Sequence, residues 1–195
     1  LNSIQYYINT QDRLSANKYL SSFAKLIRKN LESSGSKNNV IPLKEELERV
    51  ELYLELENMR FQDKITYSIK VQPGLKTDEI MLPPMFFQPF IENSIWHGIL
   101  PKNGGEVKIT IQNHEKNAVK ICIEDDGIGV KTSQAGKSTT GHNSKGIALT
   151  KKRIELLEKM LNKQIEVIGP EELLDKENKT IGTRVEIILP VDNAT

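Results

Sequence analysis

Two short segments of the chain carry the side chains most suited to chemistry, and the first covers residues 88–98. It contains Glu92, Asn93 and His97, and on a helix Asn93 and His97 share one face because they are four residues apart. Mg²⁺ prefers hard oxygen ligands and keeps several waters, so an amide oxygen and a nearby carboxylate suffice beside substrate phosphates. The segment therefore predicts a helix that holds Mg²⁺ through Asn93 and Glu92. The alternative is that Asn93 only caps neighbouring backbone and Glu92 is a solvated charge.

The second segment follows an alternating apolar run at residues 119–123, which predicts a strand. It contains Asp125 and then Gly127 and Gly129, and glycines permit a positive φ and a close approach of ligand to backbone. A carboxylate accepts a hydrogen bond from an exocyclic amine and cannot donate one to a carbonyl, so Asp125 would select adenine over guanine. An ordinary Asp-Gly turn is the alternative for this segment alone. Together the two segments predict a site for ATP and Mg²⁺.

Composition limits the other possibilities. The 195 residues are 37% hydrophobic and 27% charged, which suits one domain with a buried core and an appended element. The net charge of +1 favours neither nucleic acid nor an anionic membrane surface, so we expect no nucleic-acid partner. No apolar run approaches the roughly 18 residues that span a bilayer, so we expect the chain to face the cytosol without entering the membrane. The single cysteine, Cys122, is expected to be a small buried residue.

Apolar residues recur at helical spacing in residues 14–31 and again in residues 43–61. The segment between them is rich in turn formers, and Pro42 suits the first position of the second helix. The two segments predict an antiparallel helical hairpin. The apolar stripe of the second helix could pack inside the chain or against a second copy, and its spacing leaves both open.

After residue 62 the apolar period alternates between two and 3.6, which indicates strands and helices in turn. Residues 131–145 have too little apolar content to pack and are expected to form a lid beside the Asp-Gly turn. Residues 169–182 are expected to be a surface hairpin extension. The other elements are predicted as strands at residues 65–71, 107–111, 119–123, 165–168 and 184–189, and as helices at 84–100 and 147–161. This order predicts an α/β fold, a two-layer α/β sandwich preceded by an α-helical hairpin.

Four motifs in order carry a family resemblance: Asn93, the Asp125 turn, Gly146 after the loose loop, and Gly182 with Thr183. The set resembles the GHKL-type (Bergerat) ATPase domain shared by sensor histidine kinases, type II topoisomerases, Hsp90 and MutL. Within that superfamily the chain is most similar to the LytS/YehU-type sensor histidine kinases. Their motif typically reads Gln-Pro-Leu-Val-Glu-Asn-Ala-Ile-Lys-His-Gly, which residues 88–98 follow closely.

The N-terminal part extends this resemblance. Residues 1–4 match the end of the family's phosphoacceptor segment, Asn-Pro-His-Phe-Leu-Phe-Asn-x-Leu-Asn-Ser-Ile, and residues 43–61 resemble the helix that follows it. The resemblance implies that residues 1–62 are a partial helical dimerisation and phosphoacceptor region and residues 63–195 the ATP-binding catalytic domain. The phosphorylated histidine would lie upstream of Leu1, so we expect a fragment that binds ATP without phosphorylating itself.

The resemblance also implies a function, that of a protein histidine kinase in a two-component system. Such a kinase transfers the γ-phosphoryl group of ATP to a histidine and then to a response regulator. The intact protein is expected to form a homodimer. Its parent chain is expected to be an integral membrane protein with this part at the cytoplasmic face.

Roles implied by the resemblance attach only to matching positions. Asn93 matches the asparagine that binds Mg²⁺, Glu92 stands beside it as a second catalytic residue, and Asp125 matches the aspartate that binds adenine. Further contacts to the nucleotide are implied for Gly127 and Gly129 under the base, for Gly146 near the phosphates, and for Thr183 near Asp125.

Three positions depart from the family pattern. Trp96 stands where many relatives have a phosphate-contacting lysine, so that contact must come from His97, Lys145 or Arg153, or be absent. Ala148 replaces a frequent lid glycine, and Asp126 replaces a common asparagine and adds a negative charge near the site.

Two other functions fit the same motifs. One is an ATPase or clamp of the topoisomerase or Hsp90 type, which would need a catalytic glutamate one turn before Asn93, where Pro89 stands. The other is a degenerate sensor module that binds nucleotide or only a partner, without kinase activity.

Overall fold

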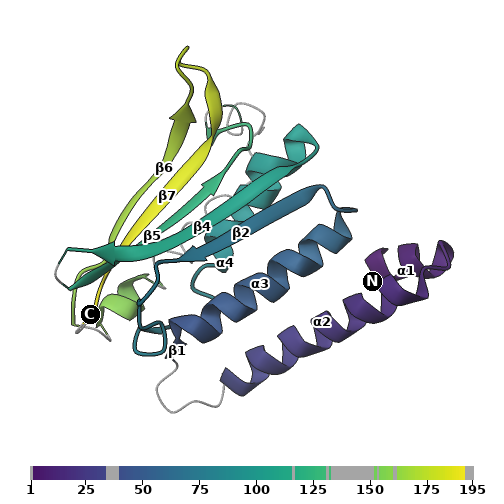
Figure 1. Cartoon of the computed structure of the whole chain (residues 1–195), viewed down its shortest axis with the longest axis horizontal. Helices are drawn as coiled ribbons and strands as arrows, with labels where there is room; N and C mark the ends of the chain where they lie inside the picture. The colour runs from purple at the N-terminus through teal and green to yellow at the C-terminus, as the bar shows by residue number, and fades with distance from the viewer. Residues whose placement is uncertain are drawn as a thin grey trace.

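The chain folds into N-terminal helices followed by a mixed sheet with helices packed on it (Figure 1). The structure, a computed structural model, describes residues 2–33, 40–115, 117–130, 132, 152, 154–159 and 162–191. The lid expected at residues 131–145 lies outside the described residues except for residue 132. Lys145, Gly146, Ala148 and Arg153 lie outside them as well.

The N-terminal part consists of α1 (Asn2–Asn9), α2 (Arg13–Ser33) and α3 (Leu43–Arg60). The Asp12 carboxylate accepts the amide of Ser15 at 3.0 Å, which is the bond of a helix N-cap and starts α2. α2 and α3 lie side by side in opposite directions (Figure 1), joined by hydrogen bonds such as Lys29 to Glu48 at 2.7 Å. The predicted antiparallel helical hairpin is confirmed. α1 has no counterpart among the predicted elements, and Pro42 stands at the N-cap position of α3 rather than inside it.

The apolar stripe of α3 packs inside the chain. Leu47, Val50 and Leu54 are buried and belong to the same core as the sheet residues. The outward stripe of α2 is different, because Leu20, Phe23, Ile27 and Leu31 are 43–69% exposed. The two stripes, similar in sequence, therefore have different surroundings.

The sheet has five strands in the order β2-β4-β5-β7-β6. β2 and β4 are parallel, and the other neighbours are antiparallel. The bounds are β2 (Ile65–Val71), β4 (Gly105–His114), β5 (Ala118–Asp125), β6 (Glu166–Leu174) and β7 (Thr180–Pro190). The predicted two-layer α/β sandwich is confirmed, and β2 agrees with its predicted range residue for residue.

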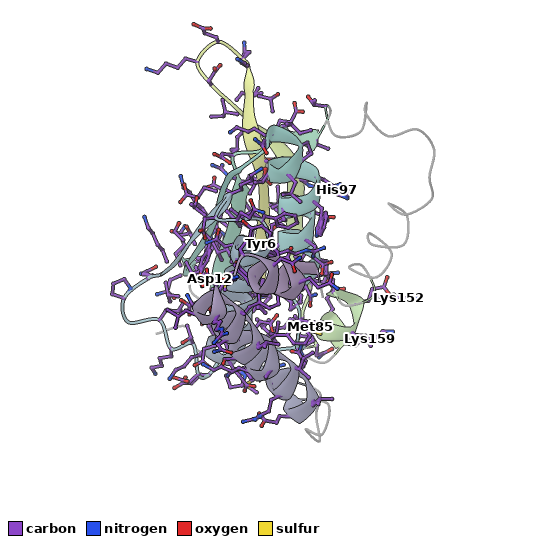
Figure 2. The ribbon with its side chains drawn as sticks, turned by 90° about the vertical axis from the view of Figure 1, so that its right-hand side faces the viewer. Tyr6, Asp12, Met85, His97, Lys152 and Lys159 are labelled. Atoms are coloured by element: carbon purple, nitrogen blue, oxygen red, sulfur yellow. The ribbon has the colours of Figure 1, made fainter. Side chains whose placement is uncertain are left out.

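One face of the sheet meets the second layer, which contains α4 (Gln88–Asn93), η1 (Ser94–Ile99), η2 (Leu100–Lys102) and the helical residues 154–159. Figure 2 shows His97 and Lys159 on the same side of the sheet. Alternating strand residues and one side of these helices interdigitate in the core, including Ile109, Ile121, Ile91, Ile95 and Leu157. The position of the nucleotide-motif helix is thus fixed by apolar burial along its length.

The other face of the sheet is polar and carries ion pairs between neighbouring strands, such as Lys120 with Glu186 at 2.7 Å and Arg184 with Glu124 at 2.6 Å. Cys122 points to this face and is only half-buried, so the prediction of a buried cysteine is wrong. The alternation along β5 turns Ile121 and Ile123 inward and leaves Cys122 among charged neighbours.

β6 and β7 continue beyond the other strands as a long hairpin (Figure 1). Its turn is closed by Asp175, whose Oδ1 accepts the amides of Glu177 and Lys179, each at 2.9 Å. The expected surface extension at residues 169–182 is confirmed. A second, two-stranded sheet of β1 (Ile41–Pro42) and β3 (Met81–Leu82) was not among the predicted elements.

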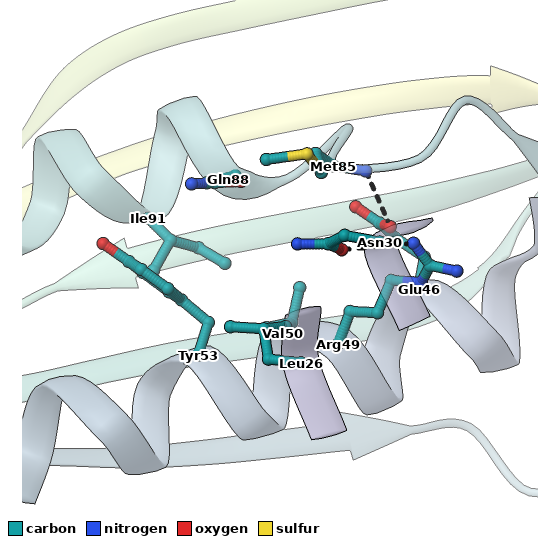
Figure 3. A pocket seen from close by; sticks show the side chains of 9 residues that line it. All are labelled: Leu26, Asn30, Glu46, Arg49, Val50, Tyr53, Met85, Gln88 and Ile91. Carbon is teal, nitrogen blue, oxygen red and sulfur yellow. Dashed lines mark hydrogen bonds between the residues drawn. The ribbon is translucent and has the colours of Figure 1, made fainter. Parts of the chain in front are cut away.

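The helix predicted from residue 84 begins at Gln88 instead. Before it, Met85 has a φ of 61°. The buried Glu46 of α3 accepts the amide of Met85 at 2.9 Å (Figure 3). It also accepts the amide of Phe87 at 3.3 Å. A carboxylate suits this position, because the first amides of a helix lack partners within it. Burial raises the pKa of Glu46 to about 7, although the amides and the charge of Arg49 act in the opposite direction.

Replacing Glu46 by Gln should change how stability depends on pH. The folded-state pKa of Glu46 lies above the ordinary value of 4.5, so the folded chain binds the proton more tightly than the unfolded chain. This contribution is present at low pH and is lost as the pH rises through about 7. Between these pH values the free energy of unfolding of the wild type should fall relative to Glu46→Gln, by about 3 kcal/mol at most.

Chemical denaturation across that pH range measures the difference. Glu51→Gln is the matched control, because Glu51 lies in the same helix and is exposed. The control should keep the wild-type dependence of the free energy of unfolding on pH. If the free energy of unfolding depended on pH equally in Glu46→Gln and the wild type, the raised pKa of Glu46 would be contradicted.

Candidate nucleotide site

The polar segment at residues 88–98 is not one regular helix. Six α-helical residues are followed by the π-helix η1, and a 3₁₀ turn, η2, ends it. Asn93 is the last residue of α4 and is exposed, while His97 lies in η1 and is half-buried. π-helical turns are rare and occur often at functional sites. The exposed amide of Asn93 is available to a ligand rather than used as a buried cap.

Asp125 ends β5 and is 4% exposed. Its carboxylate accepts the amide of Gly127 at 3.0 Å. Burial raises the pKa of Asp125 above its ordinary value, and the polar groups of Ser94, Gly127 and Thr183 act against that rise. Thr183 stands directly opposite Asp125 in the β5–β7 register, so the expected proximity of these two residues is present.

Glycines let η1 and the turn after β5 touch through backbone. A Cβ on Gly127 would collide with the backbone of Gly98, and a Cβ on Gly98 would lie 2.6 Å from Oδ1 of Asp125. The Ile128 amide also donates to the Gly98 carbonyl at 3.1 Å. Bare backbone of Gly98 therefore lies beside the Asp125 carboxylate.

Gly129 has a φ of 82°, in the left-handed region that favours glycine. A Cβ there would collide with Thr180 of β7 and approach Glu172 of β6. The second glycine of the turn is thus packed against the β6–β7 hairpin. Gly98, and not Gly129, lies against the Asp125 carboxylate, and Gly182 of β7 lies against the Asp125 backbone.

Asp126 directs its charge away from the Asp125 carboxylate. Its Oδ1 accepts the amide of Glu106 at 2.8 Å, and its Oδ2 lies 3.4 Å from Nζ of Lys102. The Lys102 ammonium also donates to the Asp126 carbonyl at 2.7 Å. The extra negative charge noted in the sequence is therefore matched locally by a lysine and anchors the start of β4.

Trp96 contacts the end of α3. Its ring makes an edge-to-face contact with Phe61 at 5.5 Å between centroids, and the Arg60 guanidinium lies 5.0 Å from the Trp96 ring. Arg60 also pairs with Glu57 at 3.3 Å. Where the family has a lysine for phosphate, this chain thus has an aromatic contact that joins η1 to α3. Of the three residues expected to replace that lysine, only His97 lies within the described residues.

Glu92 lies beside α3 as well. It accepts the Gln88 side-chain amide at 2.7 Å. Burial raises the pKa of Glu57 and of Tyr53 in α3, and the nearby Glu92 charge adds to both rises. Glu92 therefore faces the helical hairpin, while the adjacent Asn93 is exposed.

The structure thus brings Asp125, Thr183 and Gly127 together. Glu92 and Gly129 lie apart from this group, Glu92 near α3 and Gly129 against the β6–β7 hairpin. Sequence reasoning gave no role to Gly98, which lies against the Asp125 carboxylate, or to Arg60, which lies over the Trp96 ring. The one available signal was their position in or next to the quoted motifs, because each contact joins segments far apart in the chain.

A Mg²⁺ site at Asn93 fits the chemistry of the described residues. They contain no cluster of three or more His, Cys, Asp or Glu side chains that could hold a metal ion by itself. Mg²⁺ in nucleotide sites uses few protein ligands, because phosphates and waters complete its shell. One exposed amide oxygen is compatible with that arrangement.

Comparison with known proteins places the chain in a family. Residues 85–193 match the family of histidine kinase-, DNA gyrase B- and HSP90-like ATPases, and residues 1–65 match the histidine kinase family. The chain therefore belongs to the histidine kinase-, DNA gyrase B- and HSP90-like ATPases, a family of ATP-binding domains. The resemblance seen in the sequence is confirmed.

The similar proteins include sensor kinases. The chain is 28% identical to the Sensor protein LytS of Staphylococcus haemolyticus over 183 residues, which cover 92% of the chain and 29% of that protein. It is 32% identical to the Sensor protein LytS of Oceanobacillus iheyensis over 189 residues, which cover 93% of the chain and 30% of that protein. The chain thus spans less than a third of the length of these relatives.

Among solved structures, the histidine kinase domain from the Erythrobacter litoralis EL346 blue-light activated histidine kinase has the same fold. Its TM-score is 0.53 at 13% identity, and the match covers 96% of this chain and 84% of that domain. None of the helices in the described part of the chain is long and apolar enough to cross a membrane.

Replacing Gly98 by Ala should disturb Asp125. Alanine is favoured over glycine inside a helix by about 1 kcal/mol, so the change would be tolerated if Gly98 were only helical. Its Cβ would instead lie 2.6 Å from the Asp125 carboxylate, and the overpacking should cost roughly 1–3 kcal/mol of stability.

Chemical denaturation of a double mutant isolates the cause. In an Asp125→Ala background the carboxylate is gone, so the same Gly98→Ala change should cost much less. Equal costs in both backgrounds would show that the contact with Asp125 is not the reason.

Proposed function

We propose that this chain is the ATP-binding part of a two-component sensor histidine kinase. The intact protein transfers the γ-phosphoryl group of ATP to a histidine and then to a response regulator. The observation that carries the proposal is Asp125, a buried carboxylate presented beside the bare backbone of Gly98 and Gly127. The matches of residues 1–65 to histidine kinases and of residues 85–193 to the ATPase family support it.

In this proposal the adenine ring lies on the Gly98 and Gly127 backbone and its amine donates to Asp125. Thr183 stands opposite Asp125 in the β5–β7 register, so the two side chains are on the same side of the sheet. Gly129 supports the turn from the side of the hairpin. A guanine base would turn a carbonyl toward the carboxylate, and two acceptors repel each other, so the site should select adenine.

The phosphates then extend along η1 and α4 toward His97 and Asn93. Mg²⁺, when bound between Asn93 and the phosphates, would neutralise charge on the γ-phosphoryl group. His97 can donate a hydrogen bond to a phosphate oxygen, and Lys145 and Gly146 remain proposed contacts. Glu92 and Asn93 are the proposed catalytic pair, with Glu92 placed at the boundary to α3. Positioning does most of the work in phosphoryl transfer, so the rigid attachment of this helix matters more than any single acid or base.

The rest of the chain suits a kinase of this class. We propose that residues 1–62 are part of a helical dimerisation and phosphoacceptor region and that residues 63–195 form the catalytic domain. The exposed apolar stripe of α2 supports a homodimer, because isolated surface helices rarely leave such a stripe open. We place this part at the cytoplasmic face of a membrane-anchored parent, as the family resemblance implies.

The clamp-type ATPase is the less favoured alternative. It would need a carboxylate one turn before Asn93 to activate water, and that position is Pro89, in the first turn of α4. Steady release of phosphate from ATP by this chain would favour the clamp. The effect of Mg²⁺ on ATP affinity distinguishes the degenerate module from a kinase. A site that has lost its metal-binding side chains should not bind ATP more tightly when Mg²⁺ is added.

The adenine assignment predicts that Asp125→Asn weakens binding. The change replaces an acceptor by a group that is partly a donor, and loss of one hydrogen bond to a charged group costs roughly 1.5–3 kcal/mol. Affinity for ATP should fall about ten- to a hundredfold by calorimetry.

Asp126→Asn is the matched control, since the Asp126 side chain is turned toward Lys102 and Glu106. It should leave affinity within about threefold, a free-energy change below 1 kcal/mol. Unchanged ATP binding by Asp125→Asn would overturn the adenine assignment.

The metal assignment predicts a difference between ligands. Asn93→Ala should weaken binding of Mg-ATP by about tenfold or more and leave adenosine binding nearly unchanged, because only the phosphates share the ion. Asn113→Ala, at an exposed asparagine of β4, is the control. Equal losses for Mg-ATP and adenosine would mean that Asn93 supports the structure rather than the ion.

A further inference from the structure

Arg60, the last residue of α3, carries a positive charge over the surface of the nucleotide-motif helix. The central carbon of its guanidinium lies 5.0 Å from the centre of the Trp96 ring in η1 and 5.2 Å from that of Phe61. These two rings also contact each other edge to face. The Arg60 side chain is 43% exposed, so this charge is held by two aromatic rings and remains open to solvent.

Glu57 holds the same guanidinium from the side of the core. Its Oε1 accepts a hydrogen bond from Arg60 at 3.3 Å, and the Glu57 side chain is only 10% exposed. The pair is therefore asymmetric, with the carboxylate inside and the guanidinium outside. Glu57 and the two rings together set the place of the charge.

The geometry of a guanidinium leaves room for a further ligand. It is planar and carries five N–H donors that point outward in its plane. Aromatic rings contact the face of this plane, whereas carboxylates and phosphates bond its edge. Within the described part of the chain Glu57 accepts one of these donors. The remaining edge of Arg60 suits an anion that has two oxygens to offer, as a phosphate does.

The position of Arg60 relative to Asn93 indicates which anion this is. Asn93 and Trp96 are the two exposed residues of residues 88–100, and on a helix residues three apart are neighbours on the surface. In the proposed site the base lies at Gly98 and the metal ion at Asn93. A phosphate chain that joins these two points passes Trp96 and the guanidinium that lies over it.

The local charges support the same conclusion. Glu92 lies near Glu57, and its negative charge adds to the rise that burial causes in the pKa of Glu57. Two carboxylates on this side of the helix would repel a phosphate group. A cation between the helices offsets them, and Arg60 is placed to do so.

We propose that Arg60 is a phosphate-binding residue of the nucleotide site and donates from α3 to the phosphates of ATP. This proposal rests on the proposed binding of ATP at Asp125 and Asn93. Trp96 occupies the place of the family's phosphate lysine, so in this chain the cation comes from a different helix. Phosphates bonded to Arg60 would join the helical hairpin to η1.

The test compares wild type with Arg60→Gln, which removes the charge and keeps a polar side chain. By calorimetry, affinity for Mg-ATP should fall about tenfold, while affinity for adenosine should stay within about twofold. A residue that only holds Trp96 in place would weaken both ligands by the same factor. The difference between wild type and variant should shrink as the salt concentration rises, because salt screens the charge.

Arg60→Lys is the second variant. It keeps the charge and so avoids leaving the buried Glu57 without a cation, a change that can destabilise a fold. It loses the planar edge, so its affinity for Mg-ATP should lie between those of wild type and Arg60→Gln.

Arg184→Gln is the matched control. The Arg184 side chain is 39% exposed and also pairs with a carboxylate, that of Glu124 at 2.6 Å, on the polar face of the sheet. Its loss should leave affinity for Mg-ATP and for adenosine within about twofold of wild type. Equal affinity of wild type and Arg60→Gln for Mg-ATP would overturn the inference.

Inorganic triphosphate with Mg²⁺, a probe that has no base, separates this inference from the proposed function. It should bind the wild type and bind Arg60→Gln about tenfold more weakly. If Arg60→Gln binds both ATP and triphosphate as the wild type does, the role of Arg60 is refuted and ATP binding stands. If triphosphate binding depends on Arg60 and ATP binds no more tightly than triphosphate, the adenine assignment alone is refuted. Absence of binding of either ligand to the wild type would refute both.

Discussion

The backbone contact between Gly98 and Gly127 is the constraint on which the site depends. It brings the π-helix η1 against the turn after β5, and the hydrogen bond from Ile128 to Gly98 holds the two together at 3.1 Å. No side chain fits between them. Because the contact is so close, the Asp125 carboxylate lies directly against Gly98 of the helix. Two motifs that are separate in the sequence become one surface by this contact.

The nucleotide-motif helix is held at two further points by α3. Glu46 bonds the amides that precede α4, and the Phe61 and Arg60 side chains pack on Trp96 in η1. The helix is thus fixed to the helical hairpin at both ends and to the sheet by its apolar side. A displacement of α3 relative to the sheet must break these contacts or carry Asn93 and His97 with it. The position of the phosphate-binding groups is therefore coupled mechanically to the N-terminal helices.

Short-range sequence patterns predicted the elements whose position depends on the apolar period of neighbouring residues. The alternation in residues 65–71 defined β2 to the residue, and the apolar spacing of α2 and α3 defined a hairpin, because a buried face imposes its period on the sequence. The start of α4 was missed by four residues, since Glu46, far away in the chain, supplies the amides before it with an acceptor. No period in the sequence distinguishes the π-turns of η1 from an α-helix. Asp125 and Thr183 could be paired by a family resemblance, whereas the contact of Gly98 with Asp125 joins two segments of the fold and no local pattern predicts it.

The most direct test of this account is a crystal structure of the chain with Mg²⁺ and a non-hydrolysable ATP analogue. We expect the exocyclic amine of adenine within hydrogen-bonding distance of the Asp125 carboxylate and the ring on the backbone of Gly98 and Gly127. The metal ion should lie between Asn93 and the phosphates. A nucleotide whose base lies elsewhere, with no hydrogen bond from adenine to Asp125, would contradict the account.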